Sequence, residues 1–116
     1  MRLLPIEFDS RGYRFKQLDR NEFCAIYSKQ IKLTDESLGE DHFEVIDILS
    51  HNGREIHGNV QPPSEFFPSD NMWGKNGWSF TNRESAFVRF SERTKVRLDK
   101  HNLMKNSELG VSESNL

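Results

Sequence analysis

The side chains that could most readily hold a metal ion are two histidines beside a turn signal. His51 and His57 could face each other across a tight hairpin turn at Asn52-Gly53, with Asp47 close by. A small metal-dependent hydrolase is therefore one hypothesis for the function. However, no HExxH, HxH or Cys/His ligand spacing is present, and two histidines beside a turn are usually ordinary polar residues. We expect no metal ion and no other cofactor.

Nucleophilic catalysis has less support than metal chemistry. Cys24 is the single cysteine, so no disulfide can form within the chain. Its neighbours Phe23 and Ala25 place it in an expected core strand, where a thiol behaves as a small hydrophobic side chain. The sequence contains no GxSxG elbow and no glycine-rich phosphate loop. It therefore predicts a protein that is not an enzyme and has no catalytic residues.

A row of basic side chains could bind phosphate groups. Arg89, Arg93, Arg97 and Lys100 follow one stripe of an expected helix, and such a row can track a nucleic-acid backbone. Acidic residues share that helix, and the formal net charge of the chain is −2. Basic residues late in a helix also stabilise it without any partner. A solvated face is the favoured interpretation, and a nucleic-acid-binding protein that uses the basic helix 89–100 is the alternative.

The segment 66–80 is the strongest candidate for recognition. It holds both tryptophans and three of the nine phenylalanines, separated by Pro, Gly and Asn. Large aromatic side chains anchor many protein interfaces, and arginine is enriched beside them. Trp78 and Phe80 are expected mainly to cover the sheet and to fix the entry of the helix. The predicted binding residues are an apolar centre of Phe66, Phe67, Met72 and Trp73 with a rim of Lys75, Arg89 and Arg93.

A small set of predicted elements would position these residues. Alternating or β-branched patterns predict strands over 12–20, 23–31 and 43–49. Asn52-Gly53 predicts a hairpin turn that leads to a polar edge strand over 54–60. The expected fold is α+β, a small antiparallel sheet of three or four strands in a meander with one C-terminal helix packed on one face.

The helix is expected to begin at about residue 82. Thr81 and Glu84 form a capping box, in which each side chain can bond to the backbone N–H of the other residue. In the aromatic segment before it, Gly74 and Gly77 are expected to adopt backbone angles that other residues resist. The helix face toward the sheet is predicted to carry Ala86, Phe87, Phe90, Thr94 and Leu98.

Length and composition set the broad class. A chain of 116 residues fits one domain with its own core. Glu7 places an acid too early for a secretory leader, and no apolar run approaches the length of a membrane span. We expect a single domain over 1–104, a disordered tail over 105–116 and a soluble, cytoplasmic protein that does not bind membranes.

Several short motifs, most of them aromatic, follow one another in a characteristic order: Gly12-Tyr13-Arg14-Phe15, Ala25-Ile26-Tyr27, Phe43-Glu44-Val45-Ile46, Pro68-Ser69, Trp73-Gly74, Gly77-Trp78-Ser79-Phe80, and a helix with Ala86 and Phe90. This order resembles a loose group of small uncharacterised proteins encoded by bacteriophages and prophages. The resemblance covers about residues 12 to 90 and brings no catalytic residues with it. It implies a small accessory protein in the host cytoplasm that binds and modulates a host or phage macromolecule, for example as an inhibitor.

The leading hypothesis from the sequence is a non-catalytic binding module that engages another protein through the aromatic segment. Nucleic-acid binding through the basic helix is the alternative, and a metal-dependent hydrolase is the second alternative. The sequence does not predict an oligomeric state.

Overall fold

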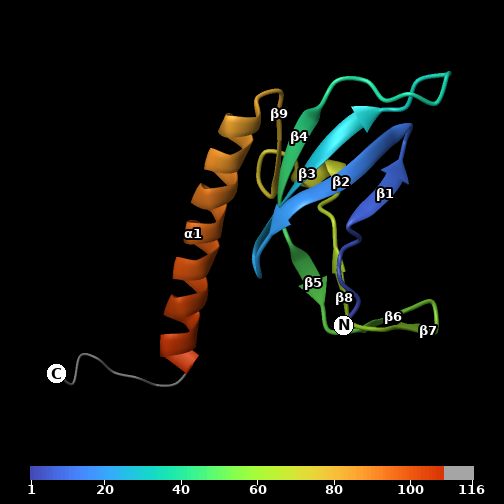
Figure 1. Ribbon diagram of the computed structural model, residues 1–116. Coiled ribbons are helices and arrows are strands. Elements are labelled where there is room, and N and C mark those ends of the chain that lie inside the picture. The colour runs from blue at the N-terminus through green and yellow to red at the C-terminus, as the bar shows by residue number, and fades with distance from the viewer. Residues whose placement is uncertain (109–116) are drawn as a thin grey trace.

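The computed structural model describes residues 1–108 and has the α+β class expected from the sequence (Figure 1). Its strands are β1 (Glu7–Ser10), β2 (Tyr13–Arg20), β3 (Cys24–Ile31), β4 (His42–Asp47), β5 (Leu49–His51), β6 (Arg54–Ile56), β7 (Asn59–Gln61), β8 (Ser64–Phe66) and β9 (Gly77–Phe80). The helices are a short 3-10 turn, η1 (Asp70–Met72), and α1 (Arg83–Glu108). Five strands form one antiparallel sheet in the order β1-β2-β3-β4-β9, and α1 packs against it.

The sheet has five strands, rather than the three or four expected, because segments outside the predicted meander complete both edges. β1 pairs with β2 through a turn at Arg11-Gly12, whose φ angles of 53° and 84° suit a tight hairpin. At the other edge, β9 pairs with β4, although the chain runs through residues 48–76 between them. The aromatic segment therefore supplies a sheet edge.

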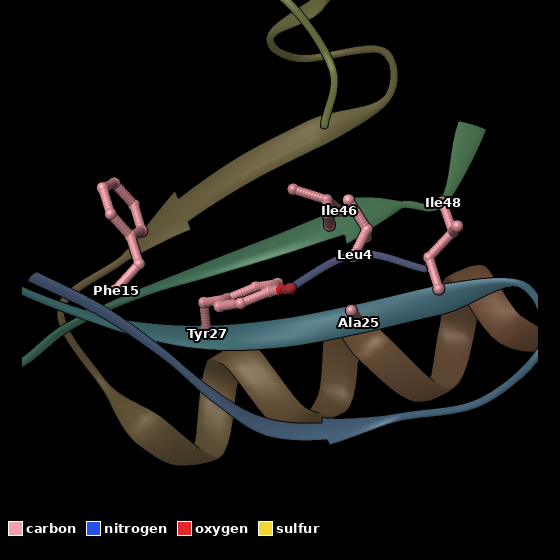
Figure 2. Packing of buried hydrophobic residues seen from close by; sticks show 6 residues of the cluster. All are labelled: Leu4, Phe15, Ala25, Tyr27, Ile46 and Ile48. Atoms are coloured by element: carbon pink, nitrogen blue, oxygen red, sulfur yellow. The ribbon is translucent and has the colours of Figure 1, made fainter. Parts of the chain in front are cut away.

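Period-two alternation along the strands gives the sheet two apolar sides. The side under α1, called the helix face, buries Cys24, Ile26, Phe43 and Val45 against Ala86 and Phe90. The opposite side, called the open face, buries Leu4, Phe15, Ala25, Tyr27, Ile46 and Ile48 (Figure 2). No α-helix covers the open face in the part of the chain that the structure describes; the N-terminal residues and the segment 64–73, which includes the 3-10 turn η1, lie over it instead.

The predicted hairpin at Asn52-Gly53 is wrong. β5 pairs with β8 and β6 pairs with β7, so the strands on either side of Asn52-Gly53 do not pair with each other. The tight turn lies instead at His57-Gly58, where both residues have positive φ angles, 50° and 81°. The stretch 54–60 is thus a small separate hairpin with its turn included, not an edge strand of the main sheet.

The helix begins one residue later than its predicted capping box requires. Asn82, rather than Thr81, is the N-cap, because its side-chain oxygen accepts a hydrogen bond of 2.9 Å from the backbone N–H of Ser85. Ala86 and Phe90 face the sheet as predicted, and Phe87 and Thr94 are partly buried. The prediction for Leu98 is wrong, since α1 has passed the packed part of the sheet and leaves this side chain exposed.

At 26 residues, α1 is about 39 Å long, and its contacts with the sheet are to β3, β4 and β9. The expected tail over 105–116 is corrected in its first part, because residues 105–108 continue the helix. Residues 109–116 lie outside the described residues. Within the described residues, no helix is both long enough and apolar enough to cross a membrane.

Candidate functional site

A solvent-accessible pocket of about 540 Å³ opens on the open face of the sheet. It lies between the ends of β1 and β2 on one side and the segment from Phe67 to Trp73 on the other. Its aromatic walls are Phe8, Tyr13, Phe15, Phe67 and Trp73, and these five residues define the aromatic pocket. Its polar lining includes Arg11, Lys29, Glu44, Asp70 and Ser79.

The aromatic walls hold one another in place. Phe8 stacks on Phe15 with ring centres 4.8 Å apart, and both contact the edge of Phe67 at 5.8 and 6.0 Å. The ring of Phe67 also stacks on Trp73 at 6.4 Å and meets Tyr27 at 5.5 Å. Offset and edge-to-face pairs of this kind are favourable beyond the area that they bury. The walls are therefore a preformed cluster of rings.

Trp73 lies flat against the edge strand β9. A Cβ atom at Gly77 would come within 2.4 Å of the Trp73 ring, so this position must be glycine for the ring to lie there. Gly77 was expected to be needed for its backbone angle, but the space beside the ring is the actual requirement. Gly74 does have the expected unusual angle, with φ at 87°, and turns the chain back toward β9.

A largely buried carboxylate, that of Glu44, lines the pocket. Glu44 is 5% exposed and accepts a 2.7 Å hydrogen bond at Oε2 from the hydroxyl of Ser79. The Ser79 oxygen in turn accepts a 3.0 Å hydrogen bond from Nε1–H of Trp73. Nζ of Lys29 lies 3.7 Å from the same Oε2, which makes an ion pair without a hydrogen bond.

The other carboxylate oxygen of Glu44, Oε1, accepts no hydrogen bond from a described residue. Among those residues, no fully buried side-chain N or O atom lacks a partner. Oε1 is therefore accessible to solvent. Since Glu44 lines the pocket, this oxygen is available to a hydrogen-bond donor that enters it.

A lysine ammonium already lies among the rings. Nζ of Lys29 lies 4.5 Å from the centre of the Tyr13 ring and 5.6 Å from that of Phe15. Both distances fall within the range of cation–π attraction. At the mouth, Arg11 and Asp70 form an ion pair of 2.7 Å, in which both side chains are well exposed. The pocket thus combines aromatic faces with two carboxylates and two cations.

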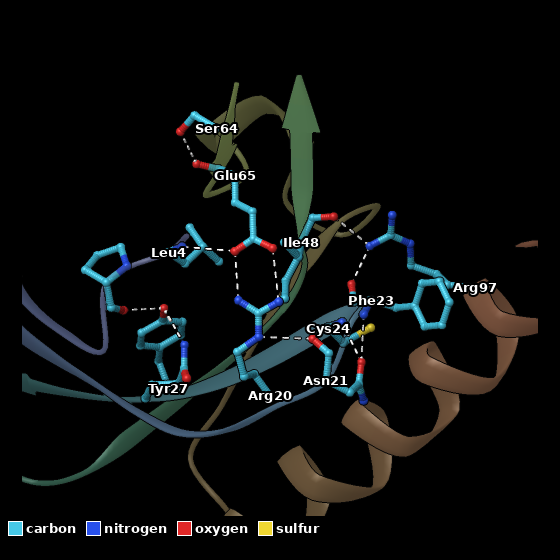
Figure 3. A network of polar contacts seen from close by, with 12 residues as sticks. Leu4, Arg20, Asn21, Phe23, Cys24, Tyr27, Ile48, Ser64, Glu65 and Arg97 are labelled. Atoms are coloured by element: carbon cyan, nitrogen blue, oxygen red, sulfur yellow. Dashed lines mark hydrogen bonds and ion pairs between the residues drawn. The ribbon is translucent and has the colours of Figure 1, made fainter. Parts of the chain in front are cut away.

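The cover of the open face is held by a second polar network, shown in Figure 3. The Arg20 guanidinium donates to both oxygens of Glu65, at 2.7 and 3.0 Å, and the Leu4 N–H donates to the same carboxylate at 3.0 Å. The Arg20 hydrogen bonds hold the pKa of Glu65 below its ordinary value, against the opposing effect of burial. The hydroxyl of Tyr27 donates to the Pro5 carbonyl at 2.7 Å. Together these bonds tie the N-terminal segment and β8 to β2 and β3.

The basic residues of the helix have structural partners of their own. Arg93 binds both oxygens of Asp47, at 3.1 and 2.7 Å, and Asn76 donates to Oδ2 of the same residue at 2.9 Å. Arg97 donates to the carbonyl oxygens of Phe23 and Ile48 (Figure 3). The expected solvated stripe is therefore wrong for Arg93 and Arg97, because both guanidiniums fasten α1 to the ends of strands.

Cys24 lies beside the Arg93–Asp47 ion pair on the helix face. It is completely buried, and burial raises the pKa of its thiol to about 11. Its Sγ lies 3.8 Å from Oδ1 of Asp47. A thiol with this pKa is protonated at neutral pH and is not a nucleophile, so its expected role as a core side chain is confirmed.

The structure divides the predicted binding surface. Phe67 and Trp73 lie together in the aromatic pocket, whereas Met72, between them in the chain at the end of η1, does not line it. Phe66 lies elsewhere, beside His51 at 6.1 Å and under Arg54. Lys75 is exposed in the turn before β9. Arg89 and Arg93 lie on the helix face over Trp78, at 5.2 and 5.0 Å, so they cannot form a rim around Trp73.

The predicted metal geometry is wrong as well. His51 pairs with Ser64 on β8, whereas His57 lies in the turn of a different hairpin. Asp47 is 1% exposed and bonded to Arg93 and Asn76, so its oxygens are already used. Within residues 1–108, no three His, Cys, Asp or Glu side chains come together as metal ligands.

The sequence-based reasoning missed Glu44, Lys29, Tyr13 and Ser79 as members of one site. One signal was available: Glu44 stands inside an apolar strand, two residues from Ile46, so strand alternation places its carboxylate on a buried side. Nothing local in the sequence indicates which residues would surround it.

We compared the chain with protein-family models, with curated proteins and with solved structures, and found no match. The resemblance to phage-encoded proteins consequently stays a prediction from the sequence.

Proposed function

We propose that this protein is a non-catalytic binding module that takes a side chain of another protein into the aromatic pocket. The observation that carries the proposal is the pocket itself, which is lined by five rings and by a largely buried carboxylate with one solvent-accessible oxygen. Concave, mostly apolar sites with a few fixed polar groups are the usual form of a binding site. Preformed aromatic walls also lose little conformational entropy when a partner binds.

The alternative, nucleic-acid binding through the helix, has weaker support. A phosphate-binding row needs free cations, but Arg93 is bonded to Asp47 and Arg97 to two backbone carbonyls. Arg89 is also paired, with Glu92 at 3.2 Å. These guanidiniums lie on the side of the sheet opposite the aromatic pocket, and the ring beside them, Trp78, already packs against Arg89 and Arg93.

The origin and setting of the protein belong to the same proposal. We infer an accessory protein of a phage or prophage that acts in the host cytoplasm and inhibits or modulates a host or phage protein. The chain's small size and its motif order support this inference. Genes of defence or counter-defence beside its coding sequence would favour an inhibitor, whereas replication genes would favour the nucleic-acid alternative.

Selection from a random-peptide display library tests the binding proposal. Peptides selected on the wild-type protein should lose at least about tenfold in affinity on Trp73→Ala, since hot-spot aromatic residues contribute this much or more. Arg89→Ala is the matched control, because Arg89 contacts a tryptophan on the other side of the sheet. Circular dichroism would establish that both variants are folded. Retention of all selected peptides by folded Trp73→Ala would refute the pocket as the binding site.

A further inference from the structure

We propose that the aromatic pocket recognises a basic side chain, lysine or arginine, on the partner protein, and that Lys29 occupies the cation position until the partner arrives. The inference rests on the proposed function and adds the chemistry of the ligand. Three features carry it: the position of the Lys29 ammonium, the free oxygen of Glu44 and the ring faces around both.

The position of Lys29 shows that a cation fits among these groups. Its ammonium lies within 5.6 Å of two ring centres and 3.7 Å from the Glu44 carboxylate. Aromatic faces carry partial negative charge, so a cation over them is attracted while it loses part of its water shell. The internal ammonium therefore marks where an external one would bind.

One oxygen of Glu44 has no protein donor among the described residues. Lys29 stands beyond hydrogen-bond distance and Oε1 is open to solvent, so a charged donor that enters the pocket can bond to this largely buried carboxylate. An ammonium or guanidinium entering the pocket has several N–H groups and can donate to Oε1 directly. Charge-assisted hydrogen bonds of this kind are stronger than neutral ones.

Lys29 can leave the position without disturbing the fold. Its side chain is 28% exposed and carries a flexible four-carbon stem, so the ammonium can move out to water. It then competes with the incoming side chain for the same rings and the same carboxylate. Removal of Lys29 should accordingly strengthen binding of a cationic ligand.

An anionic ligand would fit the pocket less well. It would gain Lys29 and Arg11, but Glu44 and Asp70 already hold these cations at 3.7 and 2.7 Å. It would also lie against the free oxygen of a buried carboxylate, where like charges repel. The charge arrangement favours a cation.

The test uses capped five-residue peptides that differ only at the central position, which is lysine, arginine, norleucine or glutamate between glycines. Binding is followed by chemical-shift titration of the backbone amides of Tyr13, Lys29 and Ser79 in the full chain. The lysine or the arginine peptide should bind at least about fivefold more tightly than the norleucine peptide, which has the same apolar stem without the charge.

Variants then assign the roles of the two charged residues. Lys29→Met should tighten binding of the basic peptides about fivefold, and Glu44→Gln should weaken it about tenfold or more. Lys16→Met is the charge-matched control for Lys29→Met, because Lys16 is exposed on the neighbouring strand and lies on the other side of the sheet. If Glu44→Gln does not fold, the peptide series on the wild-type protein and on Lys29→Met still decides the matter.

The outcomes separate this inference from the proposed function. Equal or tighter binding of the norleucine or the glutamate peptide would overturn the cation inference, and so would a Lys29→Met variant that binds basic peptides no better than wild type. In either case, library peptides that depend on Trp73 would leave the proposed function standing. A library in which no peptide depends on Trp73 would overturn the proposed function together with this inference.

Discussion

Two acidic residues on the same strand show that the two faces of the sheet differ in how the protein bonds a buried carboxylate. Asp47 and Glu44 both belong to β4, and both are at least 95% buried, but they point to opposite faces. On the helix face, a guanidinium and an amide satisfy both oxygens of Asp47. On the open face, one oxygen of Glu44 bonds to Ser79, and the other has no donor within residues 1–108 and is open to solvent. The protein itself satisfies the acid on one face, and solvent reaches the acid on the other.

The difference follows from what covers each face. α1 brings Arg93 and Arg97 across the strand ends on a rigid helical frame, so charged donors meet acceptors at fixed positions. Where the pocket lies, the open face is covered by Phe67, a short 3-10 turn and Trp73, which contribute rings rather than charged donors. Regular structure gives one face its stability, and irregular cover leaves room for a ligand on the other.

The first prediction compares the two acids directly, and we expect the largest effect here. Asp47→Ala should lower the free energy of unfolding by about 3 kcal/mol, because Arg93 and Asn76 then lose their shared partner in a mostly buried site. Glu44→Ala should cost only about 1 kcal/mol, since Lys29 and Ser79 can turn to solvent. Urea denaturation measures both values. Equal losses of unfolding free energy would contradict the contrast between the fully bonded Asp47 and the partly bonded Glu44.

A substitution under Trp73 tests how firmly the pocket wall is placed. Gly77→Ala should lower the free energy of unfolding by about 2 kcal/mol, because the new methyl group overlaps the Trp73 ring. It should also weaken peptide binding by displacing that ring.

The same substitution in a Trp73→Ala background is the control. With the ring absent, Gly77→Ala should have almost no further effect on stability, so the two changes are strongly non-additive. Additive losses would mean that glycine is needed at position 77 for a reason other than the ring.

The Arg20–Glu65 ion pair, which helps to hold the segments over the open face, should weaken in acid. Glu65→Gln should lower the free energy of unfolding by about 1.5 kcal/mol at neutral pH, since Arg20 and the Leu4 N–H lose a charged acceptor. Glu65 has a folded-state pKa below its ordinary value of 4.5. Its contribution is therefore complete above about pH 4.5 and is lost as the pH falls through the folded-state pKa.

Urea titrations of wild type and Glu65→Gln at several pH values measure this dependence. The difference between them should shrink as the solution becomes more acidic than pH 4.5. A difference that is constant down to strong acid would show that Glu65 acts through its shape rather than its charge.

The smallest effect is expected at the mouth of the pocket. Arg11→Ala should leave the free energy of unfolding unchanged within error, because the Arg11–Asp70 pair is exposed to solvent on both sides. If basic peptides enter past this pair, Arg11→Ala should also bind them slightly more tightly at low salt, since one like charge has been removed. A clear loss of stability would indicate that the Arg11–Asp70 ion pair closes the mouth of the pocket and stabilises the fold.

Much of the fold could be predicted because its central part is local. The strands that became β2, β3 and β4 are neighbours both in sequence and in the sheet, and each carries its own periodic pattern. The hairpin at Asn52-Gly53 could not be judged this way. Two glycines with positive φ, Gly53 and Gly58, lie within a few residues of each other, and each could mark a hairpin turn. Only the pairing of β5 with β8 shows that the turn is not at Gly53.

The candidate site was predictable only in part, because it depends on a distant register. Trp73 was recognised from its type and neighbours, but Glu44 joins it through the pairing of β4 with β9, which sets Glu44 opposite Ser79. Arg93 was misplaced for a similar reason. A helical pattern shows which residues share a stripe, but not that an aspartate 46 positions earlier lies beneath it.

The β6-β7 hairpin has a practical consequence for the connection between β4 and β9. Among the described residues it pairs with no other strand, and the chain passes through it on the long path from β4 to β9. The entropy of closing a loop rises slowly with length, by about 0.6 kcal/mol for each doubling. An epitope or fluorophore-binding sequence inserted at the exposed Gly58 tip should therefore leave the sheet intact. Such an insertion would provide an internal label at a position that does not line the aromatic pocket.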